Sequence, residues 1–267
     1  SEQLLMPSEL GKRWHTRGYY GAVVHNVQAI YAFYMGPYDG NPANLNPLPP
    51  AQAGAKYIEY IGGADAALAR AQADFDRGEF RWVAQIMNQL VFADPSNTAA
   101  RSLCADAFEQ LGYQTESATW RNSYLLAARE LREGLGARRS GGPIAGAAMV
   151  AQMPMPLFFD HLAMRVVPDK VAGRSMRFDW VMEDEADAFK LTLRHGALTH
   201  RPGSHGEAAD AVIRTTRAGL RKAVRRDVGF RAAIEQGEIR VDKNAPLVAE
   251  FLEGLDVFDP LFNVAEP

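Results

Sequence analysis

The chain has 267 residues, 47% of them hydrophobic and 23% charged, which fits a globular protein with one large core or two smaller ones. Its 29 basic and 32 acidic residues leave a net charge of −3, so the composition gives no sign of binding to nucleic acid or to an anionic membrane. The longest apolar stretch, near 143–155, is too short to span a bilayer. The single cysteine, Cys104, excludes an intrachain disulfide and a cysteine-based zinc site, and its alanine-rich surroundings predict a buried side chain.

The first 50 residues combine a helical pattern with a loop rich in turn formers. Apolar side chains recur at three- and four-residue steps from Gly11 to Tyr34, which predicts a helix over that range. Glycines and prolines between 36 and 50 exclude helix and strand there. Because the 41–50 loop cannot pack on itself, we expect it to reach across to a second copy of the chain.

The start of the chain shows no secretory signal, since no basic segment is followed by an apolar one. It opens without methionine, and residues 7–14 read as part of a helix already under way. We therefore expect the chain to be a piece of a longer protein.

Residues 52–135 are predicted to be helical. Gly78, Asp94-Pro95 and Gly112 are the expected stops of the first three helices, and Thr115 or Ser117 is the expected N-cap of the fourth. The four helices are predicted at 64–76, 80–92, 98–111 and 115–132.

An internal repeat lies within this helical region, and its period of 34 residues is that of tetratricopeptide hairpins. Small side chains let two helices of a hairpin approach closely, and glycine permits the turn between them. Only two repeat units are present, so they must pack against other helices to close their core. The matching pairs are Gly78 with Gly112, Ala71 with Ala105, and Ala84 with Ala118.

The remainder of the chain changes character. Glycines are frequent in residues 135–152, which predicts a linker between a helical domain, 1–134, and a C-terminal domain, 153–267. Strands and helices separate in the last region, which predicts an α+β domain with a mainly antiparallel sheet. Helices are expected at 157–166, 217–226 and 246–255, and strands at 179–183, 189–193, 197–200, 211–215 and up to 241.

Several motifs in this sequence resemble those of a known protein family. The segment Arg17-Gly18-Tyr19-Tyr20-Gly21, the loop 40–50 and the stretch 251–259 resemble zinc-dependent alkyl sulfatases of the metallo-β-lactamase superfamily. The chain resembles their C-terminal part, which has a helical dimerisation domain and a sterol-carrier-like domain. This resemblance implies a homodimer and a bacterial enzyme that is exported to the periplasm or secreted.

The same resemblance implies hydrolysis of long-chain alkyl sulfate esters, such as dodecyl sulfate, by a water activated by two zinc ions. The family's zinc motif, His-x-His-x-Asp-His, is absent from this sequence. We therefore expect the zinc ions in a metallo-β-lactamase-like domain outside the chain, and no hydrolysis by the chain alone. Its expected roles are dimerisation, closure of the active site and handling of the alkyl tail.

Two pairs of residues are candidates for the site. Resemblance implies that a tyrosine near this position binds the sulfate group, and Tyr20 is favoured over Tyr19. The alternative is that both tyrosines are packing residues of a helix. His25 and Asn26 are candidates to orient the site from behind it, although a histidine that binds a backbone carbonyl is the favoured interpretation.

Three other groups have an ordinary structural interpretation. His195, His200 and His205 lie at steps of five, which suits solvated loops better than a metal site. The basic run from Arg214 to Arg231 is interpreted as a solvated face offset by acidic residues 183–187 rather than as a headgroup site. The aromatic residues of the last domain fit an alkyl tunnel or an ordinary core, and the sequence does not separate the two.

Two other functions stay open. The chain fits a stand-alone carrier of lipids or surfactants, and it also fits a protein-interaction module that uses its helical repeat.

Overall fold

The computed structural model describes residues 3–135, 149, 152–185, 187–223, 229–256 and 262–267. The chain forms two compact units, one of residues 1–138 with 261–267 and one of residues 139–260. In the described ranges, no helix has the length and apolar character needed to cross a membrane.

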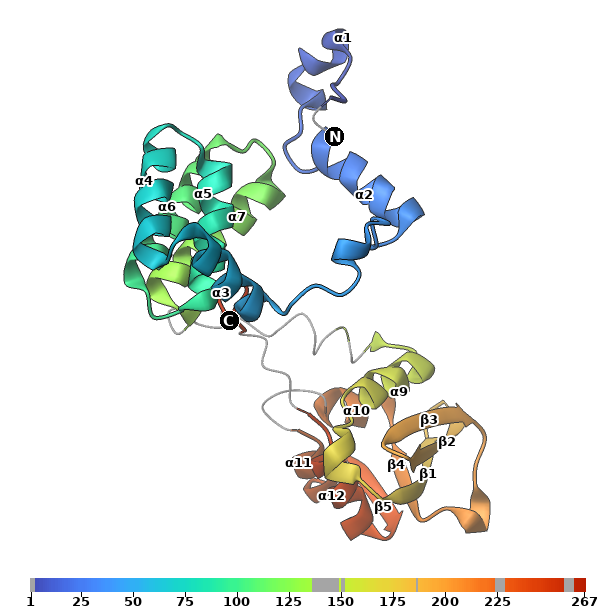
Figure 1. Cartoon of the computed structure of the whole chain (residues 1–267). Helices are drawn as coiled ribbons and strands as arrows, with labels where there is room; N and C mark the ends of the chain where they lie inside the picture. Colours follow the sequence, from blue (N-terminus) through green and yellow to red (C-terminus); the bar gives the residue numbers. More distant parts are fainter. Residues whose placement is uncertain (1–2, 136–148, 150–151, 186, 224–228, 257–261) are drawn as a thin grey trace. The chain divides into compact units, whose positions relative to one another are not determined.

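The first unit is built on five helices, which are coloured from blue-green to green in Figure 1. Consecutive helices form hairpins, and α5 packs against α3, α4 and α6 while α6 packs against α7. Met87, Leu90 and Leu131 are fully buried between them. The helices are α3 (Pro50–Ile61), α4 (Ala64–Asp76), α5 (Phe80–Ala93), α6 (Thr98–Gln114) and α7 (Ala118–Glu133).

The predicted stop at Gly112 is wrong, and the structure gives the reason. Helix α6 continues to Gln114, and Gly112 is buried inside it. A Cβ on Gly112 would lie 2.8 Å from Leu125 of α7, so this glycine lets two helices approach. Gly78, by contrast, has φ +82° in the turn before α5. The two glycines are 34 residues apart in sequence, but Gly112 allows close helix packing whereas Gly78 allows a turn.

The predicted helix from Gly11 to Tyr34 is confirmed from Val23 onward and wrong before it, because the chain turns between Arg17 and Ala22. A Cβ on Gly18 would lie 3.1 Å from the carbonyl of Gly21, so the backbone folds closely on itself there. The observed elements are α1 (Ser8–Gly11), the 3₁₀ turn η1 (Trp14–Thr16) and α2 (Val23–Met35). None of the residues of α2 is buried.

The 41–50 loop has local order of its own. It opens with the 3₁₀ turn η2 (Pro42–Asn44). The Asp39 carboxylate accepts hydrogen bonds from the Asn41 amide at 2.8 Å and from the Asn44 side chain at 2.6 Å, and these bonds lower the pKa of Asp39. These bonds order only the first turn of the loop, and its contact with a second copy of the chain stays a prediction.

The second unit contains a five-stranded sheet in the order β3-β2-β1-β4-β5. β1 pairs in parallel with β4, and all the other pairs are antiparallel. The predicted α+β fold with a mainly antiparallel sheet is confirmed. The strands are β1 (Ser175–Met182), β2 (Asp187–Arg194), β3 (Ala197–Pro202), β4 (Ala211–Thr215) and β5 (Ile239–Lys243).

The helices of this unit gather beside the sheet (Figure 1). They close a core in which Phe158, Phe159, Phe178, Trp180 and Phe251 are buried. The 3₁₀ turn η4 (Pro168–Val171) lies between α9 and β1, and the 3₁₀ turn η5 (Gly206–Ala208) lies between β3 and β4. The helices are α9 (Met155–Met164), α10 (Arg217–Ala223), α11 (Gly229–Glu235) and α12 (Ala245–Glu253), and part of the helix predicted at 217–226 lies outside the described residues.

The end of the chain differs from the domain division expected from the sequence. Residues 261–267, which were expected in the C-terminal domain, group with the helical unit. Ala265 is buried in the same core as α3–α7. Most of the expected linker, 135–152, lies outside the described residues.

Candidate functional site

The start of α7 holds the backbone of the two candidate tyrosines. The amide of Ala118 donates to the Tyr19 carbonyl at 2.6 Å. The hydroxyls of Ser117 and Thr119 donate to the Tyr20 carbonyl at 2.8 and 3.2 Å. Ser117 is the N-cap residue as predicted, but its hydroxyl binds this neighbouring segment instead of the first turn of its own helix. The free N-terminal groups of a helix thus anchor residues 19–20.

The side chains of both tyrosines stand in solvent. Tyr19 is 47% exposed and Tyr20 is 79% exposed, so the interpretation of both as helix packing residues is wrong. The Arg17 guanidinium lies 6.0 Å from the centre of the Tyr19 ring and pairs with Glu116 at 2.5 Å. A phenol is a donor that suits a sulfate oxygen, whereas the Arg17 guanidinium is already paired with a carboxylate.

His25 and Asn26 take different positions. The Trp120 indole donates to Nδ1 of His25 at 3.0 Å, so neutral His25 carries its proton on Nε2. This partner is an indole, where the sequence favoured a backbone carbonyl. The Asn26 side chain faces the turn, since a Cβ on Gly21 would lie 3.6 Å from its Oδ1.

A hollow of about 590 Å³ lies between this turn and the start of α7. It brings together segments about a hundred residues apart in sequence, and Asn26 lines it while His25 does not. Sequence reasoning missed the contributions of Arg17, Glu116 and Ser117 as site residues. The residues that line the hollow are Met6, Gly11, Thr16, Arg17, Gly18, Gly21, Ala22, Val23, Val24, Asn26, Thr115, Glu116, Ser117 and Trp120.

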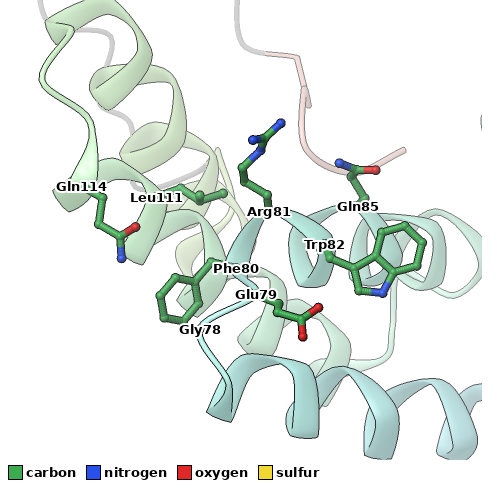
Figure 2. Close-up of a pocket in the computed structure, with 8 residues that line it drawn as sticks. All are labelled: Gly78, Glu79, Phe80, Arg81, Trp82, Gln85, Leu111 and Gln114. Carbon is green, nitrogen blue, oxygen red and sulfur yellow. The ribbon is translucent and has the colours of Figure 1, made fainter. Parts of the chain in front are cut away.

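A smaller hollow of about 370 Å³ lies where α5 begins and α6 ends. Figure 2 shows Phe80 and Trp82 pointing to opposite sides of the start of α5, with Gln114 at the far rim. The carboxylate of Glu79 is paired with Arg77 at 3.0 Å. The single carboxylate that lines this hollow is therefore held in a surface ion pair.

The three histidines of the second unit do not all lie in solvated loops, which corrects the interpretation from sequence. His195 occupies the exposed turn between β2 and β3 with φ +54°. His200 lies on β3 and pairs with Asp160 of α9 at 2.8 Å. The amide of His205 donates to the buried carboxylate of Asp179 at 2.6 Å. His200 therefore joins β3 to α9, and the backbone of His205 joins the segment after β3 to β1.

Four members of the basic run of this unit, Arg214, Arg217, Lys222 and Arg231, are paired with acid groups, as the sequence indicated for a solvated face. Arg217 binds both oxygens of Glu185 at 2.8 Å, and hydrogen bonding to this carboxylate raises the pKa of Arg217. Such pairing weakens attraction for an anionic headgroup. The other pairs are Arg214 with Asp242, Lys222 with Glu238, and Arg231 with Glu253, while Arg225 and Arg226 lie outside the described residues.

Zinc needs three or more closely placed His, Cys, Asp or Glu side chains. Among the residues that the structure describes, no such group occurs. The described residues thus do not fit a zinc pair.

The fold and the site together define a class: a helical domain with an exposed aromatic N-terminal segment, followed by an α+β domain. Comparison with known families gives the particular membership. Residues 1–134 match the alkyl sulfatase dimerisation family, and residues 143–267 match the alkyl sulfatase C-terminal family. The chain belongs to the alkyl sulfatases.

Similar proteins agree with this membership. The chain is 46% identical over 262 residues to an (R)-specific secondary-alkylsulfatase of Pseudomonas, covering 98% of this chain and 39% of that protein. It is 46% identical over 267 residues to an alkyl/aryl-sulfatase of Saccharomyces cerevisiae, covering 100% of this chain and 41% of that protein. A solved stereoselective inverting sec-alkylsulfatase from Pseudomonas matches at 44% identity and a TM-score of 0.86, covering 100% of this chain and 42% of that one. The chain spans about two fifths of the length of these relatives, and the predicted resemblance to the C-terminal part of an alkyl sulfatase is confirmed.

Proposed function

We propose that this chain forms part of an alkyl sulfatase that hydrolyses long-chain alkyl sulfate esters of the dodecyl sulfate type. The observation that carries the proposal is the match of both halves of the chain to alkyl sulfatase families. The chemistry belongs to a metallo-β-lactamase-like domain outside this chain, in which two zinc ions activate water. A sterol-carrier-like role of the second unit, in handling the alkyl tail, belongs to the same proposal.

A domain exchange tests this function. The matching segment of the Pseudomonas secondary-alkylsulfatase is replaced by this chain, and sulfate release from an alkyl sulfate is measured. We expect the chimera to hydrolyse the ester and the chain alone to release no sulfate above background. A folded chimera without activity, or turnover by the isolated chain, contradicts the proposal.

The first role of the chain in that enzyme is dimerisation, as the name of its first family indicates. A second copy of the chain suits α2, because this helix exposes several large apolar side chains that water disfavours. These are Ile30, Tyr31, Phe33, Tyr34 and Met35. Tyr38, Leu45 and Leu48, which follow α2 in sequence, are exposed as well.

The second role is to bring a sulfate-binding donor to the active site. Tyr20 is the main candidate and Tyr19 the second, because the start of α7 fixes their backbone while their phenols stay exposed. A phenol held in this way can donate to a sulfate oxygen as negative charge develops on the leaving group. His25 and Asn26 support the turn that carries the tyrosines.

Tyrosine-to-phenylalanine exchange tests this role in the chimera. Because removal of one placed donor costs on the order of 10²-fold in rate, Tyr20→Phe is expected to lower kcat/KM for dodecyl sulfate by about that factor. Tyr60→Phe on α3, where the ring is also exposed, serves as the control and is expected to leave the rate unchanged. If Tyr20→Phe and Tyr19→Phe both keep full activity, neither phenol binds sulfate.

A second candidate function, storage of an alkyl chain in the second unit, is favoured by one observation. Among the residues that the structure describes, the buried indole nitrogen of Trp180 finds no hydrogen-bond partner. Buried donors usually find a partner, and a ligand headgroup would supply one. Binding of dodecyl sulfate by the whole chain, one molecule per chain and weakened by Trp180→Phe, is the expected result. Equal binding by both forms removes this candidate.

A further inference from the structure

The last residues of the chain, 262–267, make a set of specific contacts with the helical unit. They follow the second unit in sequence, yet Ala265 and Glu266 are buried against α5, α6 and α7. Figure 1 marks the C-terminus at the helical unit. We name these six residues the tail.

The backbone of the tail is held by a buried carboxylate. Glu130 of α7 is only 1% exposed, and its Oε1 accepts hydrogen bonds from the amides of Val264 and Ala265, both at 2.7 Å. The side chain of Asn88 on α5 donates to the carbonyl of Ala265 at 3.3 Å. A carboxylate buried this deeply is costly unless hydrogen-bonded, so these amides contribute to its tolerance in the core.

A charge pair holds the side chain of the tail. The guanidinium of Arg101 on α6 binds Glu266 through two nitrogens, Nη1 to Oε2 and Nη2 to Oε1, the second at 3.3 Å. Nε of Arg101 donates to the carbonyl of Leu131 at 3.0 Å, which fixes the guanidinium in place. Only 21% of the Arg101 side chain and 9% of the Glu266 side chain are exposed. A two-point contact of this kind selects a carboxylate over other side chains.

These contacts bind both the backbone and the side chains of one short peptide. Glu130 and Asn88 form hydrogen bonds with the tail backbone, and Arg101 binds the Glu266 side chain. The methyl group of Ala265 packs in the core of the helical unit. A larger residue than alanine would meet the closely packed helices at this point.

We propose that the helical unit carries a built receptor site for the C-terminal tail, and that the tail clasps the C-terminal domain to the helical domain independently of the linker at 135–152. This inference goes beyond the proposed function, since it holds whatever reaction the complete protein performs. The occupant is the peptide of residues 262–267 of this chain.

A cut in the linker tests the clasp in the full chain. A recognition sequence for a site-specific protease replaces residues 140–146, and the chain is cleaved after folding. We expect the C-terminal fragment to co-elute with the helical fragment on gel filtration. With Glu266→Lys, which sets a cation against Arg101, the cleaved C-terminal fragment is expected to elute alone. Glu235→Lys on exposed α11 makes the same charge change elsewhere and should leave the fragments together.

The outcomes are decisive in either direction. If the fragments stay together with and without Glu266→Lys, contacts other than the tail join them and the proposal is overturned. If they separate in both cases, the tail does not clasp and the proposal is overturned as well.

A second measurement applies if Glu266→Lys fails to fold. Arg101→Met, Glu266→Gln and the double variant are compared by urea unfolding of the uncut chain. Because the two side chains act as one pair, we expect the double variant to shift the midpoint little more than either single change. Fully additive shifts show that the pair is not formed in solution and overturn the proposal.

Discussion

At the scale of single residues, Cys104 shows how burial sets chemistry. The thiol is fully buried in α6, with Sγ 3.9 Å from the carbonyl of Ala84. This burial raises its pKa to about 12, because the thiolate would lose its hydration. The interpretation of Cys104 as a buried side chain, made from its alanine-rich surroundings, is confirmed.

The thiol predicts a pH dependence of stability. An unfolded cysteine ionises near pH 8.5, whereas the folded one keeps its proton to about pH 12. Above about pH 8.5 the unfolded state binds fewer protons, so this group lowers stability as pH rises, by up to about 1.4 kcal/mol per unit. Urea unfolding from pH 7.5 to 10 is expected to show this loss in the native chain and a smaller one in Cys104→Ala. Parallel curves for the two proteins would contradict the prediction.

At the scale of elements, the helical unit depends on close approach of small residues. Gly54 in α3 faces the backbone of α5, and a Cβ there would lie 2.5 Å from the carbonyl of Gln89. Backbone atoms cannot rotate away as side chains do, so α3 would have to move. Sequence patterning predicted helix in this region but carried no sign that Gly54 is a contact point.

Gly54→Ala is therefore expected to destabilise the chain by about 2 kcal/mol through overpacking. The measurement is the free energy of unfolding in urea. Gly11→Ala is the matched control, because Gly11 is also helical and a Cβ there has its nearest neighbour at 3.7 Å. The control is expected to be neutral or slightly stabilising, and equal effects of the two changes would rule out the contact.

At the scale of the whole molecule, the exposed apolar side chains of α2 favour a dimer. Tyr31, Phe33 and Tyr34 are each more than half exposed on one helix, which a monomer would leave in water. The tail returns to the helical unit after α12 in sequence.

The proposed dimer gives a prediction at this scale. Phe33→Glu places a charge on α2 and is expected to convert the dimer to a monomer, because a charge in an apolar interface must lose its water. Sedimentation velocity measures the change. Met164→Glu, at an exposed position on α9, is the control and should leave the dimer intact. A dimer that tolerates Phe33→Glu at micromolar concentration places the interface elsewhere.

Sequence by itself determined the local elements of this protein and its family. Strand 211–215, the turn at His195-Gly196 and the helix ends at Gly78 and Asp94 follow from side-chain period and turn chemistry, which act between near neighbours. Only the tertiary structure decided the break after Arg17, the packing role of Gly112 and the pairing of His200 with Asp160. It also decided the anchoring of Tyr20 by Ser117 and the docking of the tail on Arg101 and Glu130. These features join residues far apart in the chain, so no local pattern announces them, and they exist only once the helices have packed.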